Sequence, residues 1–176
     1  QRQMCIRDSI NSSEIKMIIH GTTLATNAII ERKGAKTCFI TTEGFRDVLD
    51  IGYESRFDQY DILIEKTMSL VPRKHRYVIE ERTDINGSQI KPINTTQFKK
   101  LIEKIKSENF ESIGIGFLHS YANSENENIL KEFIFNNLPG VEVSISSEVC
   151  PEIREYERFT TTVINAYIKP LMSNYL

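Results

Sequence analysis

Tryptophan is absent from this 176-residue chain, and cysteine, proline and glycine are sparse, with three, five and eight copies. The cysteines Cys5, Cys38 and Cys150 are far apart, and no CxxC or Cys/His spacing occurs, so neither a disulfide framework nor a zinc site is indicated. Cys38 lies in the apolar run TCFI, which predicts a small buried hydrophobic side chain. This cysteine usage is typical of a reducing compartment, and we expect a cytoplasmic protein.

Long hydrophobic runs and an excess of one charge are also lacking. No segment approaches the ~20 apolar residues of a membrane-spanning helix, and the N-terminus has no apolar signal-peptide core. The 22 basic and 24 acidic residues are interleaved and give a net charge of −2, so the charge gives no reason to expect a nucleic acid or a membrane as partner. Hydrophobic residues make up 40% of the chain, which is typical of a globular domain.

Apolar runs alternate with stretches of helical spacing along most of the chain. The predicted buried strands are residues 16–19, 35–41, 112–119 and 141–146. The clearest helical stripe is formed by Phe98, Leu101, Ile102 and Ile105. Strands that alternate with helices predict an α/β fold with a partly parallel sheet and right-handed crossovers.

Several residues are typical of helix ends. Gly34 suits the position just after the first predicted helix, which begins at Thr22 or Thr23. Ser124 and Glu127 have the spacing of a capping box. The last stretch predicts one long helix that starts near Pro151 or Glu152 and is kinked or ended by Pro170.

Residues 53–93 interrupt the regular alternation. Their first part, 53–75, has no clear period, and 76–93 predicts two extended arms around Asn86-Gly87. Asn-Gly favours a type I′ turn because both central residues of that turn have positive φ. We therefore predict a β-hairpin inserted into the α/β scaffold.

The stretch HGTTLATNA (20–28) joins the first predicted strand to the first predicted helix. Ligands in parallel α/β folds bind at the carboxyl ends of strands, and the unpaired N–H groups of a helix N-terminus attract anions. The candidate cofactor-binding residues are Gly21, Thr22, Thr23, Thr26 and Asn27, with His20 beside them in the cleft. The alternative is a capped helix with a glycine entry and no ligand, and the stretch lacks the lysine and spacing of a P-loop.

A second candidate site follows the strand 141–146, in SSEVCPEIREYER. Its polar residues that we assign to a substrate or cleft are Glu148, Arg154, Glu155 and Arg158. Arg154 and Arg158 are i, i+4 neighbours, which on one helix face could both contact a phosphate or carboxylate. The alternative is a surface helix with many salt bridges.

Two further groups of residues leave alternatives open. His20 and His119 each end a predicted strand, so they either share one edge of the sheet or have structural roles; two histidines are an incomplete metal-ligand set, and no metal site is predicted. Arg46 and Arg56 lie among aromatic residues and aspartates. They either reach an anionic substrate or pair with the aspartates nearby.

Four long segments carry a resemblance to a known family: HGTTLATNAIIERKGAKTCFITTEGFRDVLDIG, LVPRKHRYVIEERTDINGSQIKPIN, IGIGFLHSYANSENE and SSEVCPEIREYERFTTTVINAYIKPLMSNYL. In this order they resemble the N-terminal domain of the hydantoinase A / 5-oxoprolinase family, which includes ATP-dependent ketone carboxylase subunits. The resemblance covers about residues 14–176. It implies an actin-like, ribonuclease H-like two-lobed ATPase with a mixed, largely parallel sheet flanked by helices.

The resemblance also implies a chemistry. Family members use ATP, and by expectation Mg²⁺, to phosphorylate the carbonyl oxygen of a cyclic amide before its ring is opened. The expected partners are a cyclic amide substrate and a second subunit or fused second half, in an oligomer. The rivals are a ketone carboxylase subunit and an actin-like lobe without chemistry of its own.

The sequence departs from the family at its beginning. No glycine-rich, aspartate-containing phosphate loop precedes Ile15, so we expect this polypeptide alone to be inactive. Residues 1–9 are interpreted as a non-native or disordered prefix. Residues 10–150 form the predicted N-terminal α/β domain, and 151–176 form the linking helix that starts the following hydantoinase A domain.

Overall fold

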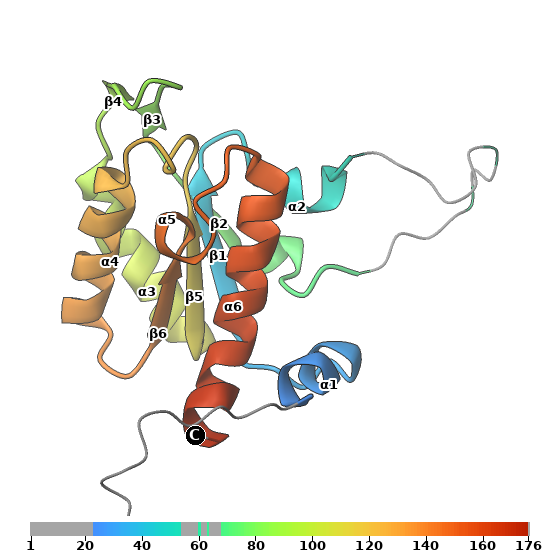
Figure 1. Ribbon diagram of the computed structural model, residues 1–176. Helices are drawn as coiled ribbons and strands as arrows, with labels where there is room; N and C mark the ends of the chain where they lie inside the picture. The colour runs from blue at the N-terminus through green and yellow to red at the C-terminus, as the bar shows by residue number, and fades with distance from the viewer. Residues whose placement is uncertain (1–22, 54–59, 61–62, 64–67, 176) are drawn as a thin grey trace, which may run out of the picture.

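The fold is built on one parallel sheet. The computed structural model describes residues 23–53, 60, 63 and 68–175 (Figure 1). Four strands pair in the order β2-β1-β5-β6, and all three adjacent pairs are parallel. The strands are β1 (Thr37–Thr42), β2 (Arg76–Ile79), β5 (Ser112–Gly116) and β6 (Glu142–Ile145). The predicted α/β class is thus confirmed, whereas the strand predicted at 16–19 lies outside the described residues.

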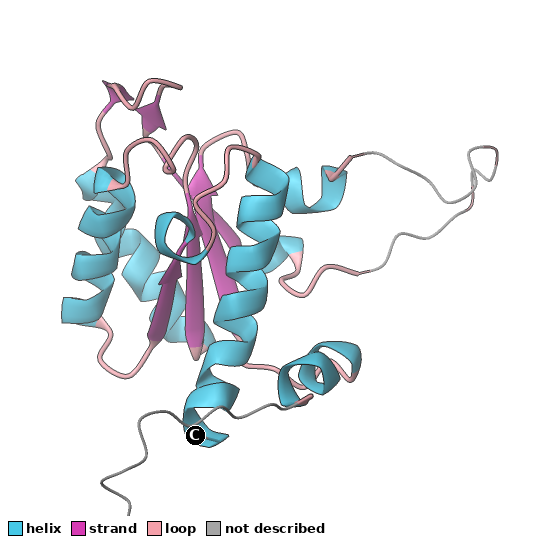
Figure 2. Cartoon of the chain, viewed as in Figure 1, coloured by secondary structure: helices cyan, strands magenta, loops and turns pink. Residues whose placement is uncertain are grey.

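Helices cover both faces of this sheet (Figures 1 and 2). One face carries α3 (Phe98–Glu108) and α4 (Glu125–Asn137), and the other carries α6 (Glu155–Tyr175). The shorter elements are α1 (Leu24–Ile30), α2 (Val48–Ile51), α5 (Ser146–Val149) and the single 3-10 turns η2 (Arg73–His75) and η3 (Thr95–Gln97). In the described part of the chain, no helix is both long enough and apolar enough to cross a bilayer.

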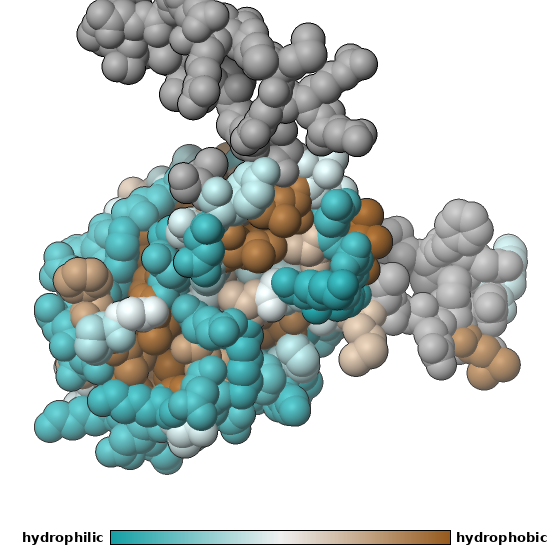
Figure 3. Space-filling view, turned by 90° about the horizontal axis from the view of Figure 1, so that it is seen from below, coloured by the Kyte–Doolittle hydropathy of each residue, from teal (hydrophilic) through white to brown (hydrophobic). Residues whose placement is uncertain are grey.

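The larger apolar core lies between the sheet and the α3–α4 layer. The predicted stripe of α3 is confirmed, because Phe98, Leu101, Ile102 and Ile105 are all buried. Cys38 of β1 is fully buried in the same core, and this burial raises the pKa of its thiol far above the usual range. Figure 3 shows the molecule from below, at the amino ends of the strands, where apolar patches lie between polar ones.

The second face depends on close contact between α6 and the sheet. The rings of Phe39 and Phe159 pack with their centroids 5.3 Å apart, directly over β5. A Cβ atom at Gly116 would lie 2.6 Å from Cδ1 of Phe159, and one at Gly114 would lie 3.2 Å from Cδ2 of Phe39. Glycine at these two positions leaves the space into which the aromatic rings fit.

A hairpin around Asn86-Gly87 is present, but two details of the prediction are wrong: residues 76–79 of its first arm form β2 of the main parallel sheet, and the turn type differs. The antiparallel strands β3 (Arg82–Thr83) and β4 (Gln89–Lys91) flank the loop, and Gly87 has a φ of 84°. A type I′ turn would require a positive φ at Asn86 as well, and Asn86 does not have one. The carboxylate of Asp84 instead accepts hydrogen bonds from the N–H groups of Asn86 and Ser88, which stabilises a longer loop.

Two predicted helix ends also differ from the structure. α1 ends at Ile30, and Arg32, with a φ of 56°, takes the left-handed conformation expected of Gly34. Gly34 is needed for another reason: a Cβ atom there would lie 2.1 Å from the ring of Tyr167 in α6. The last helix, α6, starts at Glu155, which is later than the predicted start near Pro151 or Glu152. Pro170 does not end it, because α6 continues through the proline to Tyr175.

The contact between Gly116 and α6 gives a first prediction. Gly116→Ala should lower the free energy of unfolding by about 2–3 kcal/mol, because the added methyl group overpacks the Phe159 contact. Gly114→Ala is the matched control and should cost less, since its nearest neighbour is further away. Urea denaturation of the two variants measures the difference. Equal losses would show that ring contact is not what requires glycine at 116.

Candidate functional site

Polar side chains gather at the carboxyl ends of the strands, the edge at the top of Figure 1. Parallel sheets of this type bind ligands at that edge. The buried polar residues there come from the ends of β1, β2, β5 and β6 and from the first turns of α4 and α6. They are Thr42, Glu81, Ser120, Asn126, Glu127, Ser146 and Arg158. We call this set the carboxyl-edge cluster.

Glu127 lies at the centre of one half of this cluster. Its carboxylate is fully buried and accepts hydrogen bonds from the backbone N–H of Phe117 at 3.0 Å and from the hydroxyl of Ser146 at 2.6 Å. It also accepts two bonds from Ser147, one from the N–H and one from the hydroxyl. The predicted capping box is therefore wrong: Ser124 is the N-cap of α4, but Glu127 is turned inward toward β6.

Arg158 completes the same half from α6. Its guanidinium is fully buried and donates to the backbone carbonyls of Phe117 at 3.0 Å and Glu152 at 2.6 Å, and to Ser146 Oγ at 3.2 Å. Burial lowers the pKa of this guanidinium, and the nearby Glu155 opposes that effect. Because its donors are engaged by the protein, Arg158 fixes the backbone and has little capacity left for a ligand.

The predicted cluster around Arg158 is separated by the fold. Arg154 precedes α6 and its side chain is 74% exposed, so Arg154 and Arg158 do not share one helix face as expected. Glu155 approaches Arg158 at 4.0 Å. Glu148 is exposed and forms an ion pair with Lys131 at 2.6 Å. Of the four, Arg154 has the most exposed side chain, and its guanidinium lies 3.9 Å from the Glu157 carboxylate.

Glu81 forms the second half of the cluster. It follows β2, is buried, and accepts hydrogen bonds from the hydroxyl of Thr42 and, at 2.9 Å, from the amide of Asn126. The Thr42 hydroxyl also accepts the N–H of Leu118, which connects this half to the other. Burial raises the pKa of the Glu81 carboxyl, and the bonds from Thr42 and Asn126 oppose the rise.

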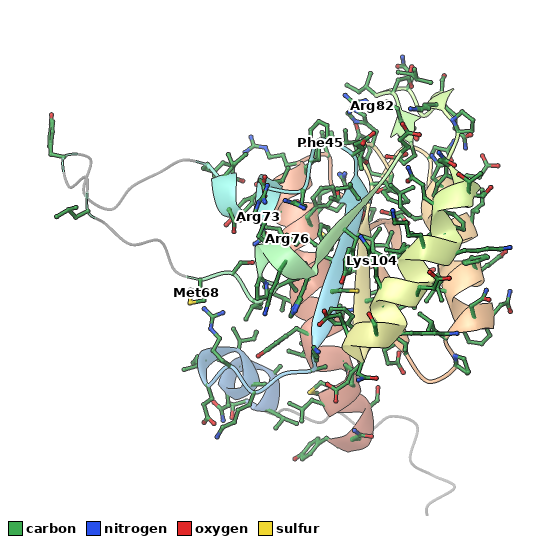
Figure 4. All side chains as sticks on the ribbon, turned by 180° about the vertical axis from the view of Figure 1, so that it is seen from behind. Phe45, Met68, Arg73, Arg76, Arg82 and Lys104 are labelled. Atoms are coloured by element: carbon green, nitrogen blue, oxygen red, sulfur yellow. The ribbon has the colours of Figure 1, made fainter. Side chains whose placement is uncertain are left out.

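Two of the aspartates near Arg46 are bound by other arginines, and Asp58 lies outside the described residues. Asp47 is paired with Arg73 at 2.8 Å, and Asp50 with Arg76 at 2.7 Å. The pairing with Arg73 lowers the pKa of Asp47. Figure 4 shows Arg73 and Arg76 beside α2, whereas Arg82 and Phe45 lie at the carboxyl edge, where the guanidinium stacks on the ring at 5.1 Å. Arg56 lies outside the described residues.

The described residues of the predicted helix mouth, Thr23, Thr26 and Asn27, are not brought to the carboxyl-edge cluster. His20, Gly21 and Thr22 lie outside the described residues, and Thr23, Thr26 and Asn27 are exposed. Figure 1 shows α1 near the amino ends of the strands, where the N–H of Ala35 bonds to the carbonyl of Tyr167. In the described part of α1 no side-chain cap is formed by Thr23. The cofactor role of this stretch stays a prediction.

The described residues form no site that could by itself bind a nucleotide and its metal ion. No group of three or more His, Cys, Asp or Glu side chains in those residues is placed to hold a metal ion. α1 has only seven residues, and its polar side chains face solvent. The described residues therefore do not fit Mg²⁺ or the phosphates of ATP by themselves.

Sequence reasoning missed Glu81, Glu127 and the inward role of Arg158. Of these, only Glu81 has a signal in the sequence, because it is a polar residue placed just after a strand. Thr42, Ser120 and Ser146 each stand at or just beyond the end of an apolar run. Such residues share one edge when their strands are parallel.

Comparison with known proteins shows the family of this chain. The model of the hydantoinase/oxoprolinase N-terminal region matches residues 3–138, well over half of the chain. The chain belongs to this family. An uncharacterised protein of Methanocaldococcus jannaschii is 45% identical over 95% of the chain and 25% of its own length. The caprolactamase subunit alpha of Pseudomonas jessenii is 34% identical over 93% of the chain and 24% of its own length.

Solved structures support the same assignment for this hydantoinase/oxoprolinase chain. The ATP-dependent caprolactamase of Pseudomonas jessenii is similar with a TM-score of 0.82 and 35% identity, over 88% of this chain and 23% of that one. A nucleotide-free acetone carboxylase is similar with a TM-score of 0.74 and 25% identity, over 84% of this chain and 22% of that one. The chain spans about a quarter of the length of the curated relatives named above.

The contacts of Glu127 give a second prediction. Glu127→Ala should destabilise this hydantoinase/oxoprolinase domain by roughly 2–4 kcal/mol, because it leaves the Phe117 and Ser147 N–H groups buried without an acceptor. Glu132→Ala, at an exposed position of the same helix, should change stability by less than about 0.5 kcal/mol. Chemical denaturation measures both. A loss at Glu127 no larger than at Glu132 would contradict the proposed importance of these bonds.

The raised pKa of Glu81 gives a third prediction. The protonated carboxyl stabilises the fold below its ordinary pKa of 4.5, and this contribution is lost as pH rises through the higher pKa of the folded state. The stability of the wild type relative to Glu81→Gln should therefore fall as pH rises above 4.5. Denaturation curves from about pH 2.5 to about pH 8, on both sides of the ordinary pKa, measure it.

Glu80 provides a control of opposite sign. Hydrogen bonds from Asn94 and Lys91 lower the pKa of this carboxyl, so its contribution is present above 4.5 and is lost as pH falls toward the lowered pKa. Glu80→Gln should change the pH dependence in the opposite direction to Glu81→Gln. If the two substitutions shift it in the same direction, the account of Glu81 is wrong.

Proposed function

We propose that this chain is the N-terminal part of an ATP-dependent enzyme that opens a cyclic amide of the hydantoin or 5-oxoproline type. The observation that carries the proposal is the structural similarity to a caprolactamase over most of the chain. Caprolactam, hydantoin and 5-oxoproline share an amide carbonyl within a ring. Such a carbonyl is a poor electrophile, and phosphorylation of its oxygen converts that oxygen into part of a leaving group.

The residues of this chain would act by positioning rather than by covalent chemistry. Phosphoryl transfer requires mainly alignment and charge neutralisation. The carboxyl-edge cluster supplies a rigid edge, because Glu127 and Arg158 fix the backbone of Phe117 from two sides. Arg154, exposed beside this cluster, is a cation that an anionic group bound at this edge can reach.

The nucleotide and Mg²⁺ contacts belong, in this proposal, largely to other parts of a longer polypeptide. Several observations support this. The chain spans about a quarter of its relatives, and the described residues form no metal cluster. We propose that the complete enzyme has the actin-like two-lobed ATPase architecture, works in the cytoplasm, and assembles with a second subunit, since one relative is named as an alpha subunit.

A ketone carboxylase is the second candidate, and the similarity to acetone carboxylase favours it specifically. Both reactions would begin at a carbonyl oxygen, so the shared fold fits either one. They differ in the second reactant. A carboxylase requires bicarbonate, whereas a cyclic amide hydrolase requires water.

The test is ATP hydrolysis by the full-length protein that contains this chain, with and without 5-oxoproline, hydantoin, caprolactam, or acetone plus bicarbonate. A cyclic amide should stimulate turnover without bicarbonate. Arg154→Ala should reduce the stimulated rate by about tenfold or more, and so should Thr23→Ala, whose predicted cofactor role requires contacts from the rest of the complete enzyme. Thr161→Ala, at an exposed position of α6, is the control and should match the wild type.

The outcomes separate the candidates. Stimulation only by a ketone with bicarbonate would establish the carboxylase and exclude the hydrolase. The absence of stimulation by every compound would contradict both enzymatic proposals. Wild-type rates in Thr23→Ala and Arg154→Ala would remove these two residues from the site while leaving the reaction class intact.

A further inference from the structure

His119 has an unusual backbone conformation at the carboxyl edge. It lies three residues after β5, a central strand of the sheet, and its φ is 52°. Positive φ is uncommon outside glycine, although asparagine, aspartate and histidine take it more often than other residues, and backbone outliers of this kind cluster at ligand sites. The turn is closed by hydrogen bonds from the N–H groups of Ala122 and Asn123 to the His119 carbonyl, at 2.9 and 3.3 Å.

The imidazole of His119 is oriented by Tyr121. Its Nδ1 lies 3.3 Å from the Tyr121 hydroxyl, and the two rings meet edge to face with centroids 5.8 Å apart. His119 is half-buried, and its Nε2 has no hydrogen-bond partner among the described residues. One ring nitrogen is thus held by the protein and the other remains available.

Arg158 supports this arrangement from below. Its guanidinium lies 5.5 Å from the centroid of the Tyr121 ring, and it bonds to the Phe117 carbonyl two residues before His119. A cation on the face of a phenol ring attracts its electrons and makes the hydroxyl a better donor. We therefore assign the Tyr121 hydroxyl as donor to Nδ1, which leaves the proton of neutral His119 on Nε2.

We propose that His119 donates a hydrogen bond from Nε2 to an oxygen acceptor of the ligand bound at the carboxyl edge, with Tyr121 as its positioning residue. This inference rests on the proposed function, in which the acceptor is the carbonyl oxygen of the cyclic amide. A donor at that oxygen stabilises the negative charge that develops there when a nucleophile adds to the carbonyl carbon.

The chain offers a matched control for the histidine. His75 is also half-buried and packs against an aromatic ring, that of Phe110, with centroids 5.0 Å apart. It lies just before β2, at the amino ends of the strands and away from the proposed site. Asparagine is suited to both tests, because it tolerates the left-handed conformation of His119 and removes the imidazole.

The first arm of the experiment measures turnover of the full-length protein with its stimulating cyclic amide. His119→Asn should lower kcat/KM by about 100-fold, as expected for the loss of one donor to a developing oxyanion. His75→Asn should stay within about twofold of the wild type. Tyr121→Phe keeps the ring on Arg158 but removes the hydroxyl, and should lower kcat/KM by roughly tenfold.

The second arm is spectroscopic and does not depend on turnover. Imidazole ¹⁵N chemical shifts of the full-length protein should show the Nε2–H tautomer of His119 in the wild type and a mixture of tautomers in Tyr121→Phe. Titration with 5-oxoproline, and separately with inorganic phosphate, should shift the His119 resonances and leave those of His75 unchanged.

The outcomes distinguish this inference from the proposed function. If the wild type turns over a cyclic amide and His119→Asn behaves like His75→Asn, the inference is overturned and the function stands. If no cyclic amide stimulates the wild type, the function fails, and the titrations then decide the inference. His119 shifts with either probe would support the oxygen-acceptor site, and unchanged His119 resonances would overturn it.

Discussion

The backbone of Phe117 is held from both sides, and the carboxyl edge of the sheet depends on this arrangement. Its N–H donates to the carboxylate of Glu127, and its carbonyl accepts from the guanidinium of Arg158. Ser146 joins the two charged groups through its hydroxyl. The ends of β5 and β6 and the first turns of α4 and α6 therefore meet around one residue, Phe117.

This arrangement explains how charged groups are tolerated in the interior. An isolated buried charge is very costly, whereas one that is fully hydrogen-bonded is much less so. Glu127 and Arg158 do not pair directly, but each is surrounded by backbone and hydroxyl partners. The geometry specifies where the connecting segments lie more than it adds stability, and an edge with fixed backbone positions is what a binding site requires.

The sequence predicted those features that depend on regular spacing. The apolar stripe of α3 and the alternation of strands and helices follow from periodicity, because burial of one face repeats with the period of the element. The hairpin was predicted from Asn86-Gly87, but the Asp84 carboxylate bonds two nearby N–H groups and selects another turn. Local propensity was overridden there by a side chain that the dipeptide rule does not consider.

The candidate site was predicted less well, for a physical reason. The i, i+4 spacing of Arg154 and Arg158 implies one face only if both residues are helical, and α6 begins at Glu155. The capping-box spacing of Glu127 describes a local bond, whereas its actual partners are ten to twenty residues away in the chain. Contacts across the sheet determine where these charged side chains lie, and the spacing of residues within one element gives no information about such contacts.

The two glycines under α6 have a consequence for how this domain can change over evolutionary time. Gly116 faces Phe159 and Phe39 at the same time, so the three positions share one fixed volume. A larger residue at 116 becomes acceptable only when both rings move away or are replaced by smaller side chains, because a Cβ atom there would lie 2.6 Å from Phe159 and 2.8 Å from Phe39. Among relatives that keep this helix in contact with the sheet, the three positions should therefore vary together rather than independently.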